Sequence, residues 1–323
     1  MWRLLYILVQ VLFIVGIFGF LFWSAVNATD NEGNNVFTAL QEQPKRWHFL
    51  VAAFFAQLLG LSLTIIRWRW LVLTLGLEIS RREAFRLGFL GYVLQLILLG
   101  PVGGDAVKAA IFAKRNPNNM SKAVASIFID RFIGLVVMFL CAAFFILYTG
   151  FHSLTHPTAL FFTYLTFALT VAALLGSAIV FHPFFSKGYL ERMIEKIPFC
   201  GKLFSSFVQA LLLYRDHKRV LLKCCFITIF VHMSFGLSLY WAAIGLFTSV
   251  PSFVEHIMLH SIANLTAMLP IAVGPYEFVL EQIYQLQEVR ITGMGFVVSL
   301  MYRLTTIFVA IAAVAFYYAA KRK

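Results

Sequence analysis

Long apolar runs dominate the chain, and short polar segments separate them. A membrane span needs about 20 mostly apolar residues, and six runs approach or exceed that length: 4–26, 48–66, 123–149, 159–181, 220–247 and 291–320. Two further apolar runs, 87–113 and 256–287, are interrupted by Pro and Gly at 100–104 and 270–275. Pro removes a backbone donor and Gly tolerates unusual dihedral angles. Each interrupted run therefore predicts two short arms that form a re-entrant hairpin.

Composition supports the same fold class. The chain is 61% hydrophobic and only 12% charged, whereas a soluble domain has about 25% charged residues. The first apolar run is longer than the core of about 7–15 residues in a secretory signal, so we expect it to be retained as a span. The prediction is an all-α polytopic membrane protein, with residues 1–323 forming a single integral membrane domain of about six spans and two re-entrant hairpins.

The formal net charge of +12 reflects basic residues clustered at the ends of the apolar runs. This is the positive-inside pattern, and it predicts both termini in the cytoplasm, an amphipathic cytoplasmic segment at 183–219, and residence in the cytoplasmic (inner) membrane. The sequence Arg67-Trp68-Arg69-Trp70 is interpreted as part of an interfacial belt. No basic-aromatic module accompanies the charge, so nucleic-acid binding is not expected.

With this topology the two hairpins enter the membrane from opposite faces. That arrangement is typical of inverted-topology repeats in transporters. The predicted repeats cover approximately residues 1–150 and 159–323, and each contains a span, a hairpin and then an arginine-bearing span.

The same spacing of an acid and an arginine occurs in both predicted repeats. Asp105 precedes Arg131 by 26 residues, and Glu277 precedes Arg303 by 26 residues. A charge at membrane depth costs about 2.5–3.5 kcal/mol on insertion scales, so each arginine needs a partner. One hypothesis is a structural ion pair, with Asp105 or Asp130 satisfying Arg131 and Glu277 satisfying Arg303. The other is an anion site, and the two are compatible because an arginine can exchange a carboxylate for a phosphate.

The predicted hairpin tips offer backbone amides at the start of each outgoing arm. A helix N-terminus with glycines is a ready anion site, whereas Asp105 and Glu277 would equally serve as helix caps. Lys108, one turn beyond Asp105, is placed to pair with it. The candidate substrate-binding residues are Gly103, Gly104, Asp105, Lys108, Asp130, Arg131, Gly274, Tyr276, Glu277 and Arg303.

Several residue types that support other chemistries are arranged without a recognisable pattern. The sequence has no metal-ligand spacing, nucleophile motif or cofactor fingerprint, so we expect no metal, no cofactor and no catalytic residue. His232 and His260 are interpreted as packing residues that make hydrogen bonds.

The order and spacing of the polar motifs resemble a known family over residues 1–320. The similarity is to the lysylphosphatidylglycerol synthase transmembrane family, and it rests on Gly100-Pro-Val-Gly-Gly-Asp105-Ala-Val-Lys108, Ser121-Lys-Ala, Asp130-Arg131, Gly274-Pro-Tyr-Glu277 and Tyr302-Arg303. The family's second motif is usually Gly-x-Gly-x-x-Glu, and Gly-Pro-Tyr-Glu replaces it here. The resemblance implies a flippase-like domain that moves phospholipids or polyprenyl-type lipids between leaflets. Bifunctional members also carry a soluble aminoacyl-lipid synthase, which a chain ending at Lys323 would lack.

The function that we expect from these features is lipid translocation, with membrane lipids of anionic headgroup as partners and a homo-oligomer as an open possibility. An alternative is a proton-coupled secondary transporter of a small solute, in which Asp130 or Glu277 would bind the proton. A third is an enzyme, or a partner of an enzyme, in membrane lipid or glycan biosynthesis.

Overall fold

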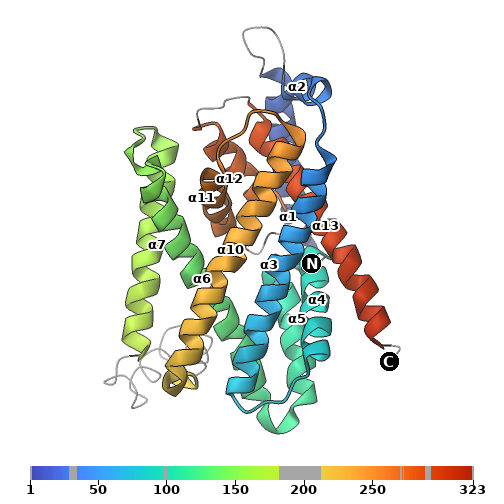
Figure 1. Cartoon of the computed structure of the whole chain (residues 1–323), viewed down its shortest axis with the longest axis vertical. Coiled ribbons are helices and arrows are strands. Elements are labelled where there is room, and N and C mark those ends of the chain that lie inside the picture. Colours follow the sequence, from blue (N-terminus) through green and yellow to red (C-terminus); the bar gives the residue numbers. More distant parts are fainter. Residues whose placement is uncertain are drawn as a thin grey trace.

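The chain forms a bundle of helices (Figure 1). The computed structural model describes residues 2–28, 35–97, 100–181, 212–269, 271, 273–287 and 292–321. The α-helices in these ranges are α1 (Trp2–Asn27), α2 (Val36–Glu42), α3 (Trp47–Thr74), α4 (Arg81–Ile97), α5 (Gly100–Arg115), α6 (Met120–Tyr148), α7 (Pro157–Phe181), α10 (Lys218–Leu246), α11 (Phe253–Ala263), α12 (Pro275–Tyr284) and α13 (Met294–Lys321). Short 3-10 turns link some of them: η1 (Pro117–Asn119), η2 (Phe151–Ser153), η4 (Arg215–His217) and η5 (Asn264–Met268).

Five of the described helices are long and apolar enough to cross a membrane: α3, α6, α7, α10 and α13. Each of them overlaps most of one predicted run: α3 overlaps 48–66, α6 overlaps 123–149, α7 overlaps 159–181, α10 overlaps 220–247 and α13 overlaps 291–320. Helix α1 contains the predicted run at 4–26. The predicted fold class, an all-helical integral membrane protein, is therefore confirmed. Most of the predicted cytoplasmic segment 183–219 lies outside the described residues.

Each interrupted apolar run forms two short helices. The run at 87–113 gives α4 and α5, which pack against each other, and the run at 256–287 gives α11 and α12. In Figure 1 the pair α4 and α5 lies in the lower half of the molecule, whereas α11 and α12 lie in the upper half. The two pairs therefore approach the middle of the bundle from opposite ends.

The predicted position of the first break is wrong. Helix α5 begins at Gly100, so Pro101, Gly103 and Gly104 lie inside it and do not form a turn. The physical reason is that proline is well tolerated in the first turn of a helix, where its missing N–H has no intrahelical partner. The amides of Gly103 and Gly104 are consequently not at a hairpin tip.

Gly104 instead allows α4 and α5 to approach closely. A Cβ atom at this position would lie 2.4 Å from the carbonyl oxygen of Gly91 and 2.9 Å from the backbone nitrogen of Gln95, both on α4. Any larger residue would force the two helices apart. The glycine therefore fixes the α4–α5 pair as one closely packed unit.

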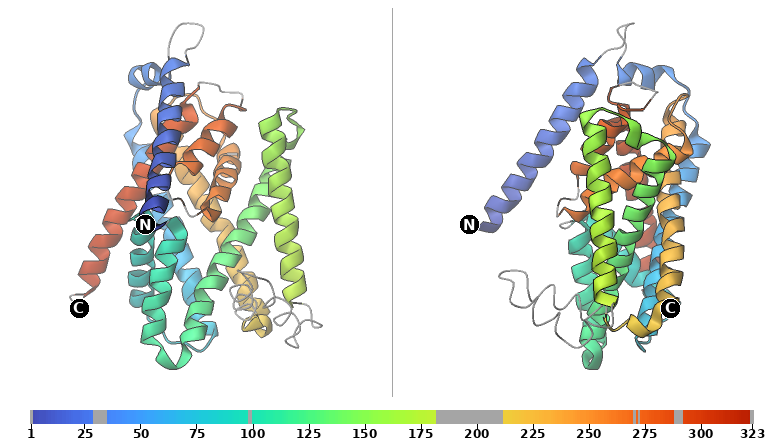
Figure 2. Two further views of the ribbon diagram at one scale, coloured as in Figure 1. Left: turned by 180° about the vertical axis from the view of Figure 1, so that it is seen from behind. Right: turned by 90° about the vertical axis from the view of Figure 1, so that its left-hand side faces the viewer.

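The second break agrees with the predicted position. Helix α12 begins at Pro275, and Gly274 before it has a backbone φ of +108°. Residues with a side chain rarely adopt this conformation, so Gly274 is required by the turn into α12. Helix α1 leans against α12 and α13 and diverges from the bundle toward its N-terminus (Figure 2).

Candidate functional site

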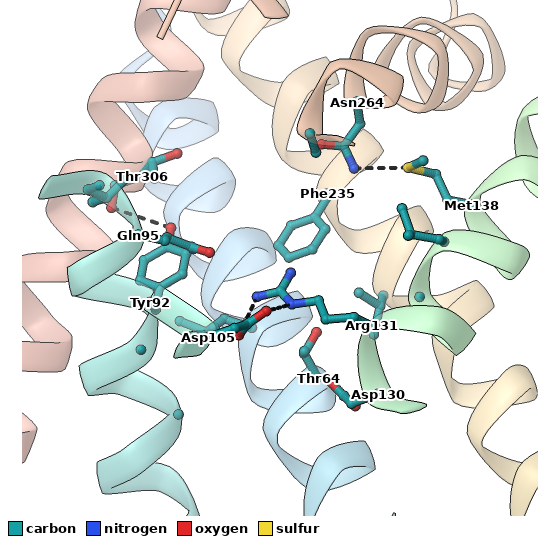
Figure 3. Close-up of a pocket in the computed structure, with 18 of the residues that line it drawn as sticks. Thr64, Tyr92, Gln95, Asp105, Asp130, Arg131, Met138, Phe235, Asn264 and Thr306 are labelled. Atoms are coloured by element: carbon teal, nitrogen blue, oxygen red, sulfur yellow. Dashed lines mark hydrogen bonds and ion pairs between the residues drawn. The ribbon is translucent and has the colours of Figure 1, made fainter. Parts of the chain in front are cut away.

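A cavity of about 680 Å³ lies between the two pairs of short helices, and seven of the ten candidate substrate-binding residues line it. Figure 3 shows three of them, Asp105, Asp130 and Arg131, at this cavity. Its walls come from α3, α4, α5 and α6 and from α10, α11, η5, α12 and α13. The candidate residues that line it are Asp105, Lys108, Asp130, Arg131, Tyr276, Glu277 and Arg303. Gly103, Gly104 and Gly274 are not among the lining residues.

Asp105 and Arg131 form the ion pair that their spacing suggested. The guanidinium contacts both carboxylate oxygens: Nε donates to Oδ2, and Nη2 donates to Oδ1 at 2.8 Å. This pair is open to the cavity, because 46% of the Arg131 side chain and 18% of the Asp105 side chain are accessible. Asp105 lies in the second turn of α5, so its carboxylate pairs with Arg131 and does not cap the helix. The accessible guanidinium is thus held in place while one edge faces the cavity.

The Glu277 carboxylate pairs with an arginine and also caps a helix, and the sequence suggests both roles. Its Oε1 atom pairs with Arg303, while its Oε2 atom accepts a hydrogen bond of 2.7 Å from the backbone nitrogen of Gly274 at the start of α12. The Glu277 side chain is fully buried, and 22% of the Arg303 side chain remains accessible. The carboxylate therefore caps α12 and also orients the arginine toward the cavity.

Asp130 pairs with Arg67 and not with its neighbour Arg131. Arg67 Nε donates to Asp130 Oδ1 at 2.8 Å, and Arg67 Nη1 donates to Thr228 Oγ1 at 2.8 Å. Only 4% of the Arg67 side chain and 6% of the Asp130 side chain are accessible. Successive residues on a helix do not face the same way, so α6 directs Asp130 toward α3 and Arg131 toward α5.

The interpretation of Arg67 as an interfacial residue is therefore wrong. The Arg-Trp repeat looked like a belt, but the guanidinium is buried because a carboxylate on α6 compensates its charge. The signal that could have found it is Asp130 itself, an acid at membrane depth that required a basic partner.

Lys108 lies over an aromatic ring and not beside a carboxylate. Its Nζ atom is 3.6 Å from the centroid of the Trp68 ring, a cation–π contact. Among the described residues Lys108 makes no ion pair, so the predicted pairing with Asp105 is not seen. The residue is only 8% accessible and lines the cavity.

Neutral polar side chains that sequence reasoning missed complete the walls. Gln57 on α3 donates to Thr306 Oγ1 at 2.6 Å and to the Tyr92 hydroxyl at 3.2 Å. His260 contacts the Tyr276 hydroxyl at 3.0 Å through Nδ1, in agreement with its expected role as a hydrogen-bonded packing residue. A single glutamine inside an apolar run was the only sequence signal for the Gln57 cluster.

The charges around the cavity do not balance. The lining residues include three carboxylates and four lysine or arginine side chains. Each carboxylate is paired with one arginine, which leaves the Lys108 ammonium in excess. A cavity with one surplus positive charge favours an anionic ligand.

Comparison with known proteins gives one family match. The family model described as the lysylphosphatidylglycerol synthase TM region matches residues 7–313, which is nearly the whole chain. No curated protein matches the chain.

Proposed function

Because the chain belongs to the lysylphosphatidylglycerol synthase TM family, we propose that it is a translocase that moves a phosphate-bearing lipid between leaflets. The lipid is a phospholipid or a polyprenyl-type lipid. The observation that carries the proposal is one cavity that holds both Arg131 and Arg303, each oriented by a carboxylate from a short helix.

The depth of the two arginines supports this proposal. Arg131 is eleven residues after the start of α6 and Arg303 is nine residues after the start of α13. At about 1.5 Å per residue these positions are about 17 Å and about 14 Å from the helix starts. Half of the hydrocarbon core is about 15 Å, so we propose that both guanidinium groups lie near the midplane, where a phosphate needs compensation most.

The rim of the cavity also suits a lipid. Its accessible lining residues include Phe128 and Arg131 on α6 and Met268 on η5, with accessible fractions of 37% for Phe128 and 50% for Met268. We propose that the cavity opens beside Arg131, where Phe128 and Met268 offer apolar contacts. A lipid headgroup would enter through this opening while the acyl chains stay in the bilayer.

The order of the elements supports an inverted repeat. Helices α3, α4, α5 and α6 correspond in order to α10, α11, α12 and α13: a long helix, two short helices, and a long helix that carries an arginine. The short pairs come from opposite ends of the bundle (Figure 1). In transporters such repeats exchange access between the two sides, which is the motion that translocation requires.

Arg131 would bind the headgroup by exchanging its carboxylate partner for a phosphate. In the resting state Arg131 makes two parallel bonds to Asp105, and a phosphate presents the same geometry of two oxygens to the guanidinium. A headgroup phosphate would replace the carboxylate at Arg131 or share the guanidinium with it. Translocation makes and breaks no covalent bond, so we propose a transporter and not an enzyme.

The proposal is tested with purified protein in liposomes that contain lipids with fluorescent headgroups, by following the fraction accessible to an external quencher. We expect Arg131→Ala and Arg303→Ala each to slow headgroup movement by about tenfold or more, because a charge-assisted contact is lost. Arg115→Ala is the matched control, since Arg115 pairs with Glu83 away from the cavity. If both cavity variants keep the wild-type rate, the proposed function is wrong.

The location follows from the same proposal. We propose residence in the cytoplasmic membrane with both termini in the cytoplasm, as the distribution of basic residues indicates. Accessibility of single cysteines placed near each end, tested with an impermeant reagent on intact cells, would decide the orientation.

A proton-coupled transporter of a small solute is the second candidate. The observation that favours it is a fully buried carboxylate, Glu277, on the wall of the cavity. Uptake of a water-soluble substrate that depends on a pH gradient, with no movement of lipid, would support this candidate over the first.

A further inference from the structure

We infer that the cavity selects lipids whose headgroup carries one net negative charge, and that the positive charge of Lys108 determines this preference. The ligand class is a phosphodiester monoanion, as opposed to a pyrophosphate or a zwitterionic headgroup. This inference rests on the proposed function, because it names the substrate class of the same site.

All but one of the lysine, arginine and carboxylate side chains that line the cavity belong to an ion pair. The three carboxylates each satisfy one arginine, in the pairs Arg67–Asp130, Arg131–Asp105 and Arg303–Glu277. These pairs carry no net charge. The fourth basic lining residue is Lys108, which makes no ion pair with any described residue. The cavity therefore carries one positive charge when it is empty.

Packing against Trp68 holds the Lys108 side chain at the cavity wall. Its ammonium lies 3.6 Å from the Trp68 ring centroid, and the fully buried Trp68 is itself fixed by a hydrogen bond of 3.2 Å from Nε1 to Ser126 Oγ. The backbone of α5 is locked against α4 at Gly104. With 8% accessibility, Lys108 reaches the cavity but not bulk water. An aromatic ring stabilises an ammonium group less than an anion does. An anionic ligand would therefore stabilise the Lys108 ammonium further.

The net charge of the cavity stays the same if Arg131 exchanges the Asp105 carboxylate for a phosphate. If a phosphate displaces Asp105 from Arg131, that carboxylate needs a new cation. Lys108 is three residues after Asp105 on α5 and on the same helical face. The ammonium is then available to Asp105, while the phosphate takes Arg131. The sum of charges in the loaded cavity is the same by either route.

Charge matching then ranks the possible ligands. A phosphodiester with one negative charge makes the loaded cavity neutral. A pyrophosphate leaves at least one uncompensated negative charge at membrane depth, and a zwitterionic headgroup leaves the Lys108 charge uncompensated. Uncompensated charge in the membrane interior is costly, so we expect the monoanion to bind most tightly.

The test measures binding to the purified full chain in detergent, by native mass spectrometry or titration calorimetry. The probes are dioctanoyl phosphatidylglycerol, which has one negative charge, dioctanoyl phosphatidylcholine, which is zwitterionic, and farnesyl pyrophosphate. We expect the wild type to prefer the first over the other two by about tenfold, the size of one well-placed charge interaction. Lys108→Gln should reduce the preference over phosphatidylcholine to about twofold or less, whereas Lys108→Arg should keep it.

Lys114→Gln is the matched control, because Lys114 is exposed on the same helix and does not line the cavity. A wild type that binds phosphatidylcholine or the pyrophosphate as tightly as phosphatidylglycerol would overturn the inference, even if Lys108→Gln fails to fold. A folded Lys108→Gln variant with undiminished preference would overturn the role of Lys108. Selective binding without transbilayer movement would instead contradict the proposed function and leave the charge rule standing.

Discussion

Asp130→Asn should destabilise the protein far more than Arg131→Gln, although the two residues are adjacent. The change at Asp130 leaves the Arg67 guanidinium, which is 4% accessible, without a carboxylate. Breaking a buried ion pair from one side costs about 3–5 kcal/mol in the free energy of unfolding. Arg131 is 46% accessible to the cavity, and pairs of that exposure contribute about 0–1 kcal/mol.

The measurement is reversible unfolding of the purified protein in mixed micelles with increasing denaturing detergent. A matched double variant, Arg67→Met with Asp130→Leu, removes both charges and should recover at least half of the lost stability, since replacement of a whole buried pair is often nearly neutral. Arg131→Gln should keep the wild-type transition while lipid movement is lost. Equal destabilisation by the two single changes would refute the division into a structural pair and a ligand-facing pair.

Three further predictions concern the scaffold. Gly104→Ala should lower the free energy of unfolding by about 1–3 kcal/mol, because its Cβ would lie 2.4 Å from the Gly91 oxygen, whereas Gly176→Ala, with no atom within 4 Å, should not destabilise the protein in the same unfolding assay. Glu281→Gln should cost about 1–3 kcal/mol, since this buried carboxylate accepts hydrogen bonds of 2.7 and 2.8 Å from two amides near the start of α13, and hydrogen exchange there should rise. Gln57→Leu should cost about 1–3 kcal/mol by leaving the hydroxyl groups of Tyr92, Thr306 and Ser238 without their amide partner, and a variant as stable as the wild type would contradict this assignment.

The long helices and the two charge pairs open to the cavity could be predicted because strong physical constraints act on them. Lipid requires continuous apolar helices, and it also requires that Arg131 and Arg303 have partners. The repeated spacing from each acid to its arginine pointed to Asp105 and Glu277 and left Asp130 open as an alternative partner of Arg131. The structure pairs Arg131 with Asp105 and Arg303 with Glu277.

What the sequence could not provide was the direction in which neighbouring side chains point. Nothing in the local pattern around Arg67 indicates a partner 63 residues later, so the Arg-Trp repeat looked interfacial. The start of α5 was missed for another reason: Gly-Pro is compatible with both the end of one helix and the beginning of the next. The cation–π contact of Lys108 depends on the packing of α5 against α3, which no sequence spacing encodes.

The ion pairs of the cavity also have a consequence for how the protein is made. Arg67–Asp130 and Asp105–Arg131 are both complete within the first 148 residues, and Glu277–Arg303 is complete within the last helices. Among the described residues no ion pair joins the early and late parts of the chain: Gln57 contacts Thr306, and the Arg67 guanidinium contacts the neutral hydroxyl of Thr228. Each half therefore brings both members of its own ion pairs as it leaves the ribosome and enters the bilayer. Insertion of the first half need not wait for synthesis of the second.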